Sequence, residues 1–163
     1  MKITTAMLLA AGLGTRMKPL TDTLPKPLIE VGGRTLVDRV LDKLVAQGVT
    51  RAVVNVHYLA DKMIAHLKTR KDIEIVISDE RAVLLETGGG VIQALPLLGN
   101  DPFFVINTDV TWATPGDTTF AKMAEAYDPN EMDALLLVAE MGATLGFRGP
   151  GDFFLGHDGL LQR

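Results

Sequence analysis

Two glycines near the N-terminus are followed by two cations in a pattern that suits phosphate binding. Gly12 and Gly14 directly follow an apolar run, and Arg16 and Lys26 come next along the chain. Glycine lets the backbone approach a ligand closely, the amides of such a turn can face phosphate oxygens, and fixed cations neutralise their charge. Lys26 lies between two prolines, which restrict its backbone and reduce the freedom lost on ordering. The pattern predicts a phosphate-bearing ligand at the end of a parallel strand.

Two further motifs carry groups that suit the same ligand. A second glycine-rich turn is expected at residues 87–90, and Asp109 follows an apolar strand. Because ligands bind beyond the carboxyl ends of parallel strands, we expect all three motifs to share one crevice. A carboxylate such as that of Asp109 can hold Mg²⁺ together with substrate phosphates. Asn107 lies one side-chain alternation away, so it would face the same way and could bind a sugar.

Two common nucleotide-binding fingerprints do not fit the first motif. The Rossmann pattern requires a third glycine where this chain has Met17, and the Walker pattern requires a Gly-Lys-Ser/Thr sequence that does not follow the turn. An NAD-dependent oxidoreductase is therefore disfavoured. The histidines have no partner at metal-ligand spacing, and we interpret them as structural.

The elements that must position these motifs alternate between strands and helices. Apolar runs predict strands, and apolar residues at helical spacing predict amphipathic helices. This alternation predicts an α/β fold with a three-layer, doubly wound, mostly parallel sheet. The expected strands are 3–10, 52–56, 73–77, 103–106 and 134–139, and the expected helices are 36–45, 59–67, 91–98 and 120–127.

The composition is that of an ordinary globular domain. The chain has 163 residues, of which 47% are hydrophobic and 22% charged, which is enough for one domain with a proper core. A formal net charge of −4 gives no general attraction to nucleic acid or to an acidic membrane. The absence of cysteine excludes disulfides and suits a reducing compartment. We therefore expect a cytoplasmic protein without nucleic-acid or membrane partners.

Taken together, the motifs resemble those of the sugar-1-phosphate nucleotidylyltransferases. Residues 9–21, 25–28, 86–90 and 107–109 match that family's motifs in the family's order. Within the family the chain is most similar to the bacterial N-acetylmuramate-1-phosphate uridylyltransferases of peptidoglycan recycling, and residues 151–153 support this. Mannose-1-phosphate guanylyltransferases share most of these residues. The resemblance implies a Rossmann-like nucleotidyltransferase fold.

The resemblance also implies roles for single residues. It places Arg16 at the β- and γ-phosphates, Lys26 at the α-phosphate and the sugar phosphate, and Asp109 on Mg²⁺. These three are the predicted catalytic residues, and Asn107 and Gly151 are the predicted substrate-binding residues. The predicted nucleotide-binding residues are Leu9, Ala10, Ala11, Gly12, Gly14, Thr15, Arg16, Lys26, Glu86, Thr87 and Gly88.

The implied reaction is displacement at the α-phosphorus of a nucleoside triphosphate by a sugar-1-phosphate oxygen, with pyrophosphate as the leaving group. That nucleophile is already ionised near neutral pH, so the protein must align two polyanions and neutralise their charge rather than supply a base. The expected activity is Mg²⁺-dependent NDP-sugar synthesis by a monomer or small homo-oligomer. UTP and N-acetylmuramate 1-phosphate are the favoured substrates.

The family continues with further strands and helices that supply sugar contacts and a second metal-binding Asp, and nothing in residues 152–163 matches that Asp. We therefore expect residues 1–163 to form a single nucleotidyltransferase domain that lacks the family's C-terminal portion, binds nucleotide and turns over poorly alone. The alternative function is a nucleotide-binding regulatory subunit without turnover. The presence of Arg16, Lys26 and Asp109 argues against it.

Overall fold

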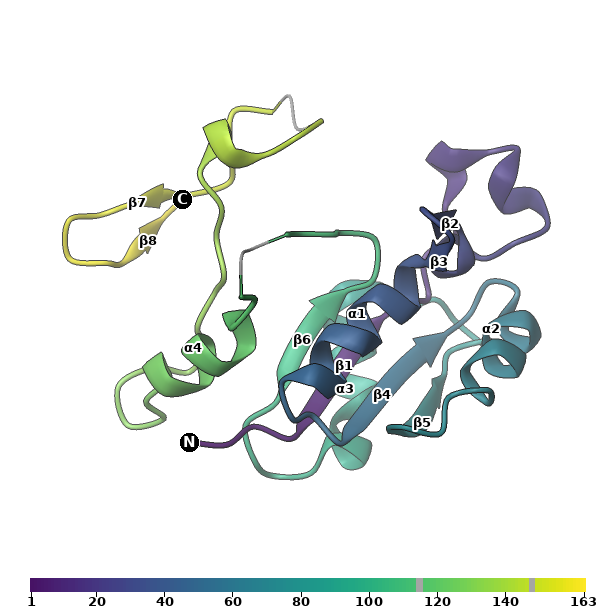
Figure 1. The fold of residues 1–163 in the computed structure, drawn as a ribbon, viewed down its shortest axis with the longest axis horizontal. Helices are drawn as coiled ribbons and strands as arrows, with labels where there is room; N and C mark the ends of the chain where they lie inside the picture. The colour runs from purple at the N-terminus through teal and green to yellow at the C-terminus, as the bar shows by residue number, and fades with distance from the viewer. Residues whose placement is uncertain (114–115, 147–148) are drawn as a thin grey trace. The chain divides into compact units, whose positions relative to one another are not determined.

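The computed structural model describes residues 1–113, 116–146 and 149–163, and the chain divides into two compact units, Met1–Ala126 and Tyr127–Arg163. The first unit is built on a four-stranded parallel sheet with the strand order β5-β4-β1-β6 (Figure 1). After β5 at one edge the chain returns to place β6 beside β1, so the direction of strand addition reverses between β1 and β6. The bounds are β1 Thr5–Leu9, β4 Arg51–Val56, β5 Glu74–Asp79 and β6 Phe104–Asn107.

Helices cover both faces of this sheet, which makes three layers. Because side chains alternate along a strand, Ala6 and Leu8 of β1 pack into one core cluster and Met7 packs into another. The first cluster joins the sheet to α1, α2 and α4, and the second joins it to α3; Figure 1 shows α1 and α3 on opposite sides. The expected doubly wound α/β fold is confirmed. The helices are α1 Leu36–Ala46, α2 Ala60–Leu67, α3 Glu86–Leu98 and α4 Thr119–Ala126.

The segment between β1 and α1 folds into short elements that fix the first glycine motif. Gly14 has a φ of +64°, and a Cβ there would lie 2.9 Å from Thr21 Cγ2. The buried Thr21 hydroxyl donates a hydrogen bond to the carbonyl of Gly14 at 2.8 Å. Glycine is therefore required at position 14 for both conformation and space. These elements are the 3₁₀ helices η1 Thr15–Met17, η2 Leu20–Asp22 and η3 Lys26–Leu28 and the antiparallel strands β2 Glu30–Val31 and β3 Arg34–Thr35.

The expected turn at residues 87–90 is instead the beginning of a helix. We predicted a helix only from residue 91, whereas α3 begins at Glu86 and includes the three glycines. Glycine is unfavourable inside helices by about 1 kcal/mol relative to alanine, which is why the pattern indicated a turn. Tertiary packing accounts for one of these glycines, because Gly90 lies against side chains that leave no room for a Cβ.

The second unit contains the 3₁₀ helix η4 Met141–Ala143 and the antiparallel pair β7 Phe154–Leu155 and β8 Leu161–Gln162. The strand expected at 134–139 is wrong. No strand is formed there in the part of the chain that the structure describes, and residues 136–138 are exposed. An apolar run needs a pairing partner to become a strand. The single nucleotidyltransferase domain expected for residues 1–163 stays a prediction.

No helix among the described residues is both long and apolar enough to cross a membrane.

A cluster of charged side chains around Arg70 ties α1 to the connection between α2 and β5. The Arg70 side chain is 8% exposed and its guanidinium contacts Asp38 at 3.1 Å, Asp42 at 2.8 Å and Asp72 at 2.7 Å. Burial opposes ionisation of Asp38, but hydrogen bonds from Thr35 and Arg70 outweigh it and hold the pKa of Asp38 below its usual value of 3.8. The ionised carboxylate therefore stabilises the fold.

We expect the free energy of unfolding to fall as the pH is lowered from about 4. A carboxylate whose folded pKa is depressed stabilises the fold above its unfolded pKa, and this is lost as the pH falls through its folded pKa. Replacing Arg70 with leucine should cost about 2 kcal/mol at pH 7, because it removes the buried guanidinium that hydrogen-bonds to buried Asp38. It should also flatten the dependence below pH 4. Urea titrations from pH 2.5 to 7 test this, with exposed Lys71→Leu as the control. An equally steep acid dependence in the Arg70 variant would contradict it.

Candidate active site

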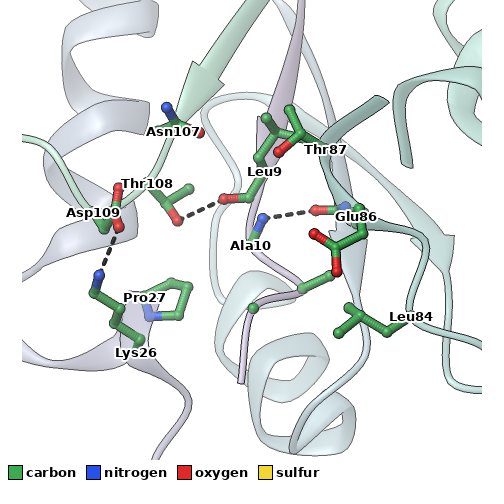
Figure 2. A pocket seen from close by; sticks show the side chains of 13 residues that line it. Leu9, Ala10, Lys26, Pro27, Leu84, Glu86, Thr87, Asn107, Thr108 and Asp109 are labelled. Atoms are coloured by element: carbon green, nitrogen blue, oxygen red, sulfur yellow. Dashed lines mark hydrogen bonds and ion pairs between the residues drawn. The ribbon is translucent and has the colours of Figure 1, made fainter. Parts of the chain in front are cut away.

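A pocket opens at the carboxyl ends of β1 and β6, at the point where the strand order reverses (Figure 2). Open parallel sheets bind their ligands at such a crevice. The cavity has a volume of about 220 Å³. It is lined by Leu9, Ala10, Ala11, Gly12, Lys26, Pro27, Asn55, Leu84, Glu86, Thr87, Asn107, Thr108 and Asp109.

The structure brings together most of the site residues predicted from the sequence. The predicted residues that line the pocket are Leu9, Ala10, Ala11, Gly12, Lys26, Glu86, Thr87, Asn107 and Asp109.

The other predicted residues do not line the pocket. Gly14, Thr15 and Arg16 lie just beyond it in the chain, and Arg16 is exposed on η1. Gly88 follows the lining residue Thr87 within α3. Gly151 lies in the second unit. The roles assigned to these residues remain predictions.

Sequence reasoning missed Pro27, Asn55, Leu84 and Thr108. Asn55 had a usable signal, because it interrupts the apolar run 52–56 of a strand that ends at the same edge of the sheet as β1. Thr108 lies between two residues that were predicted. Leu84 carries no chemical signal, since an apolar side chain indicates packing as readily as a binding surface.

One side of the pocket carries a pair of opposite charges. The Lys26 ammonium donates a hydrogen bond to Asp109 Oδ2 at 2.6 Å, and the two side chains are 24% and 37% exposed (Figure 2). Lys26 begins η3 between Pro25 and the buried Pro27, and Asp109 follows β6 after one intervening residue. A cation and a carboxylate on rigid flanking segments are thus held at the pocket. They can serve a phosphate and a metal ion, respectively.

The opposite side is formed by the start of α3 and the residues before it. Figure 2 shows Leu84, Glu86 and Thr87 across from Lys26 and Asp109, with the end of β1 between them. Glu86 has a φ of +60°, a left-handed conformation that costs a residue with a side chain about 1 kcal/mol or more. The first amides of a helix have no partner within the helix and can be donated to a ligand.

The backbone leaves open space at the end of β1 within the pocket and at the start of α3 beside it. A Cβ at Gly12 or at Gly88 would meet nothing within 4 Å. A flat base or a phosphate can therefore approach the backbone closely at these two positions.

The end of β1 is held by side chains from both neighbouring strands. The Thr108 hydroxyl donates to the carbonyl of Leu9 at 2.9 Å, and the Ala10 N–H donates to Asn55 Oδ1 at 2.6 Å. Leu9 is the last residue of β1 that pairs with a neighbouring strand, and Ala10 follows it. Hydrogen bonds from side chains therefore hold the chain where the backbone pairing ends. Because the Ala10 N–H already bonds to Asn55, only the carbonyl of Ala10 is left to contact the nucleotide as predicted.

The carboxylates at the pocket suit a metal that is held partly by a substrate. Among the described residues, no group of three or more His, Cys, Asp or Glu side chains is placed to hold a metal ion. Asp109 and Glu86 are the acidic residues in the lining. Mg²⁺ is often bound by one or two carboxylates together with substrate phosphates and water. The residues present fit that mode of binding, with Asp109 beside the Lys26 ammonium.

Comparisons with known proteins agree with this geometry. Residues 6–150 match the family model described as the MobA-like NTP transferase domain. An N-acetylmuramate alpha-1-phosphate uridylyltransferase of Caulobacter vibrioides is 52% identical over 96% of this chain and 66% of its own length. A protein of the same name from Neisseria meningitidis serogroup B is 43% identical over 83% of this chain and 58% of its own length.

A solved structure of HddC from Yersinia pseudotuberculosis complexed with GMP-PN is 26% identical, with a TM-score of 0.62 over 76% of this chain and 54% of that one. The chain therefore spans between about half and two thirds of the length of these three proteins.

Proposed function

Because the chain belongs to the family of MobA-like NTP transferase domains, we propose that it transfers the nucleotidyl group of UTP to N-acetylmuramate 1-phosphate. The products are the UDP-sugar and pyrophosphate, and we propose that the reaction serves peptidoglycan recycling. The observation that carries the proposal is the pocket where the strand order reverses, with Lys26 and Asp109 facing the start of α3. The 52% identity to an N-acetylmuramate alpha-1-phosphate uridylyltransferase supports the choice of substrates.

In this proposal the base lies against the backbone of residues 10–12 and the start of α3. The open space at Gly12 and Gly88 supports this placement. The triphosphate then extends toward Lys26, whose ammonium exchanges the Asp109 carboxylate for oxygens of the α-phosphate and the sugar phosphate. Arg16, exposed on η1 beyond the pocket, contacts the departing pyrophosphate.

The protein's task is to hold two anions in line for attack at phosphorus. Lys26 offsets the repulsion between them and stabilises the charge that is redistributed as the new P–O bond forms and the bond to pyrophosphate breaks. Its flanking prolines reduce the entropy lost on ordering. Asp109 is the residue that would hold Mg²⁺, which neutralises phosphate charge and polarises the P–O bonds when bound. Asn107 lines the same side and would contact the sugar.

We further propose that the protein works in the cytoplasm as a monomer or small homo-oligomer. The lack of cysteine, which suits a reducing compartment, supports the location.

Pyrophosphate release tests the proposed reaction. UTP, GTP, CTP and dTTP are each combined with Mg²⁺ and with N-acetylmuramate 1-phosphate, mannose 1-phosphate or glucose 1-phosphate. The assay uses this chain and the same chain extended by the part of the Caulobacter vibrioides relative that its match does not cover. We expect the highest rate with UTP and N-acetylmuramate 1-phosphate. Preference for GTP and mannose 1-phosphate would favour the guanylyltransferase alternative. Nucleotide binding without pyrophosphate release in any combination would favour a regulatory subunit.

A further inference from the structure

A buried carboxylate lies behind the pocket and is not among its lining residues. Glu80 follows β5 directly and is 2% exposed. Its Oε1 accepts a hydrogen bond from Asn55 Nδ2 at 2.8 Å, whereas its Oε2 is buried and has no hydrogen-bond partner in the described part of the chain. A buried polar atom without a partner costs about 1–3 kcal/mol, so its retention calls for a reason other than stability.

Asn55 connects this carboxylate to the pocket. Its amide oxygen accepts the Ala10 N–H at 2.6 Å, and its amide nitrogen donates to Glu80. A backbone N–H donates and the Glu80 Oε1 accepts, so both partners favour the same orientation of the amide. Glu80 thereby helps to hold the oxygen of Asn55 toward Ala10.

Two further contacts hold Glu80 in place. Its backbone N–H donates to the carbonyl of Val56 at 2.8 Å, and its own carbonyl lies 2.7 Å from Nδ1 of His57. The carboxylate therefore projects from a backbone that is anchored to the end of β4.

The start of α3 packs directly on the Asn55–Glu80 pair. A Cβ built at Gly90 would lie 2.8 Å from Asn55 Nδ2 and 2.8 Å from Glu80 Oε1. Gly90 is fully within α3 and needs no unusual φ, so space alone explains the glycine. The pair thus touches two segments that surround the pocket: the end of β1 through Ala10, and α3 through Gly90.

We propose that Glu80 is a positioning residue for the nucleotide, acting through Asn55 on the backbone at residues 10–12. This inference rests on the proposed function, because it concerns the base that this backbone faces. With Glu80 in place, the Ala10 N–H bonds to Asn55 and is not available to the ligand, and the carbonyl of Ala10 is held in one direction. Without Glu80, the Asn55 amide nitrogen loses its acceptor, so the side chain is free to rotate away from Ala10 and release that strand end. Glu80 would therefore affect both the affinity for UTP and the preference for UTP over GTP.

Calorimetric titration with UTP and with GTP, each with Mg²⁺, tests the proposal on three variants. Glu80→Gln retains an oxygen acceptor for Asn55 and should stay within about twofold of the parent Kd. Glu80→Leu removes it and should weaken UTP binding about tenfold, the effect of losing one buried hydrogen bond, and narrow the preference for UTP over GTP. Gly90→Ala keeps every polar group but displaces the pair, so it should act in the same direction.

Asp38→Asn serves as the matched control, since Asp38 is a 5% exposed, hydrogen-bonded carboxylate that does not line the pocket. It should lower stability and leave the UTP Kd unchanged.

The outcomes separate this inference from the proposed function. A parent chain that binds none of the nucleotides would overturn the proposed function and this inference with it. Suppose instead that the parent chain binds UTP and that the folded fraction of Glu80→Leu has the same Kd and the same preference for UTP. This result would overturn the positioning role alone. Should Glu80→Leu fail to fold, Gly90→Ala decides in its place, and an unchanged Kd there would overturn it equally.

Discussion

Replacing Lys26 with alanine should reduce turnover by about 10²–10³-fold, the typical cost of losing one preorganised charge from a transition state. Lys26 is the one Lys or Arg among the described residues that line the pocket, and its ammonium already lies against the carboxylate at that site. Its side chain is 24% exposed, so alanine also removes some packing of its aliphatic part, but the flanking prolines and the elements around them remain. The chain should therefore stay folded while pyrophosphate release falls.

Two further variants sharpen this test. Lys26→Arg should recover only part of the rate, because the guanidinium is larger and donates in a fixed planar fork rather than from a compact ammonium. Lys71→Ala removes an exposed lysine from the connection between α2 and β5 and should leave the rate unchanged. If Lys26→Ala turns over as fast as Lys71→Ala, Lys26 takes no part in the reaction.

Replacing Asp109 with asparagine should raise the Mg²⁺ concentration needed for half-maximal rate by about tenfold or more. An amide is nearly isosteric with a carboxylate but is a poorer ligand for a hard cation. The fold should persist, since Asp109 is 37% exposed and an ion pair of that exposure contributes at most about 1 kcal/mol. The variant also leaves Lys26 without its anion, so we expect weaker positioning of the lysine as well as of the metal.

The readout for Asp109 is the rate of pyrophosphate release as a function of Mg²⁺ concentration. Asp101→Asn, an exposed carboxylate change before β6, is the matched control and should titrate like the parent. If Asp109→Asn also titrates like the parent, Asp109 only pairs with Lys26 and the metal is held elsewhere.

The sequence predicted the two central strands of the sheet well because they are largely buried. β1 and β4 are nearly continuous apolar runs, as expected for parallel strands covered on both faces, and their strand ends carry the polar motifs. The sequence therefore predicted that the first glycine motif and Asp109 lie at one edge of the sheet. The family resemblance added the roles of individual residues, which composition and spacing do not supply.

What the sequence missed depends on tertiary contacts. The three glycines of α3 indicate a turn by local preference, and only the Asn55–Glu80 pair beneath Gly90 explains why that position of the helix requires a glycine. The apolar run at 134–139 looks like a strand, but strands are formed by partners that a single segment does not reveal. The sequence did not reveal the roles of Asn55 and Glu80 for the same reason. Asn55 bonds to Ala10, 45 residues away in the chain, and to Glu80, 25 residues away.

The central claim is that the pocket between β1, β6 and the start of α3 binds a nucleoside triphosphate. The most direct test is to follow the backbone amide resonances of the labelled chain while UTP is added in the presence of Mg²⁺. We expect the largest chemical-shift changes at Ala11, Gly12, Thr87 and Gly88, with smaller ones along residues 14–26. Saturating shifts centred on another part of the molecule, or none at all, would contradict it.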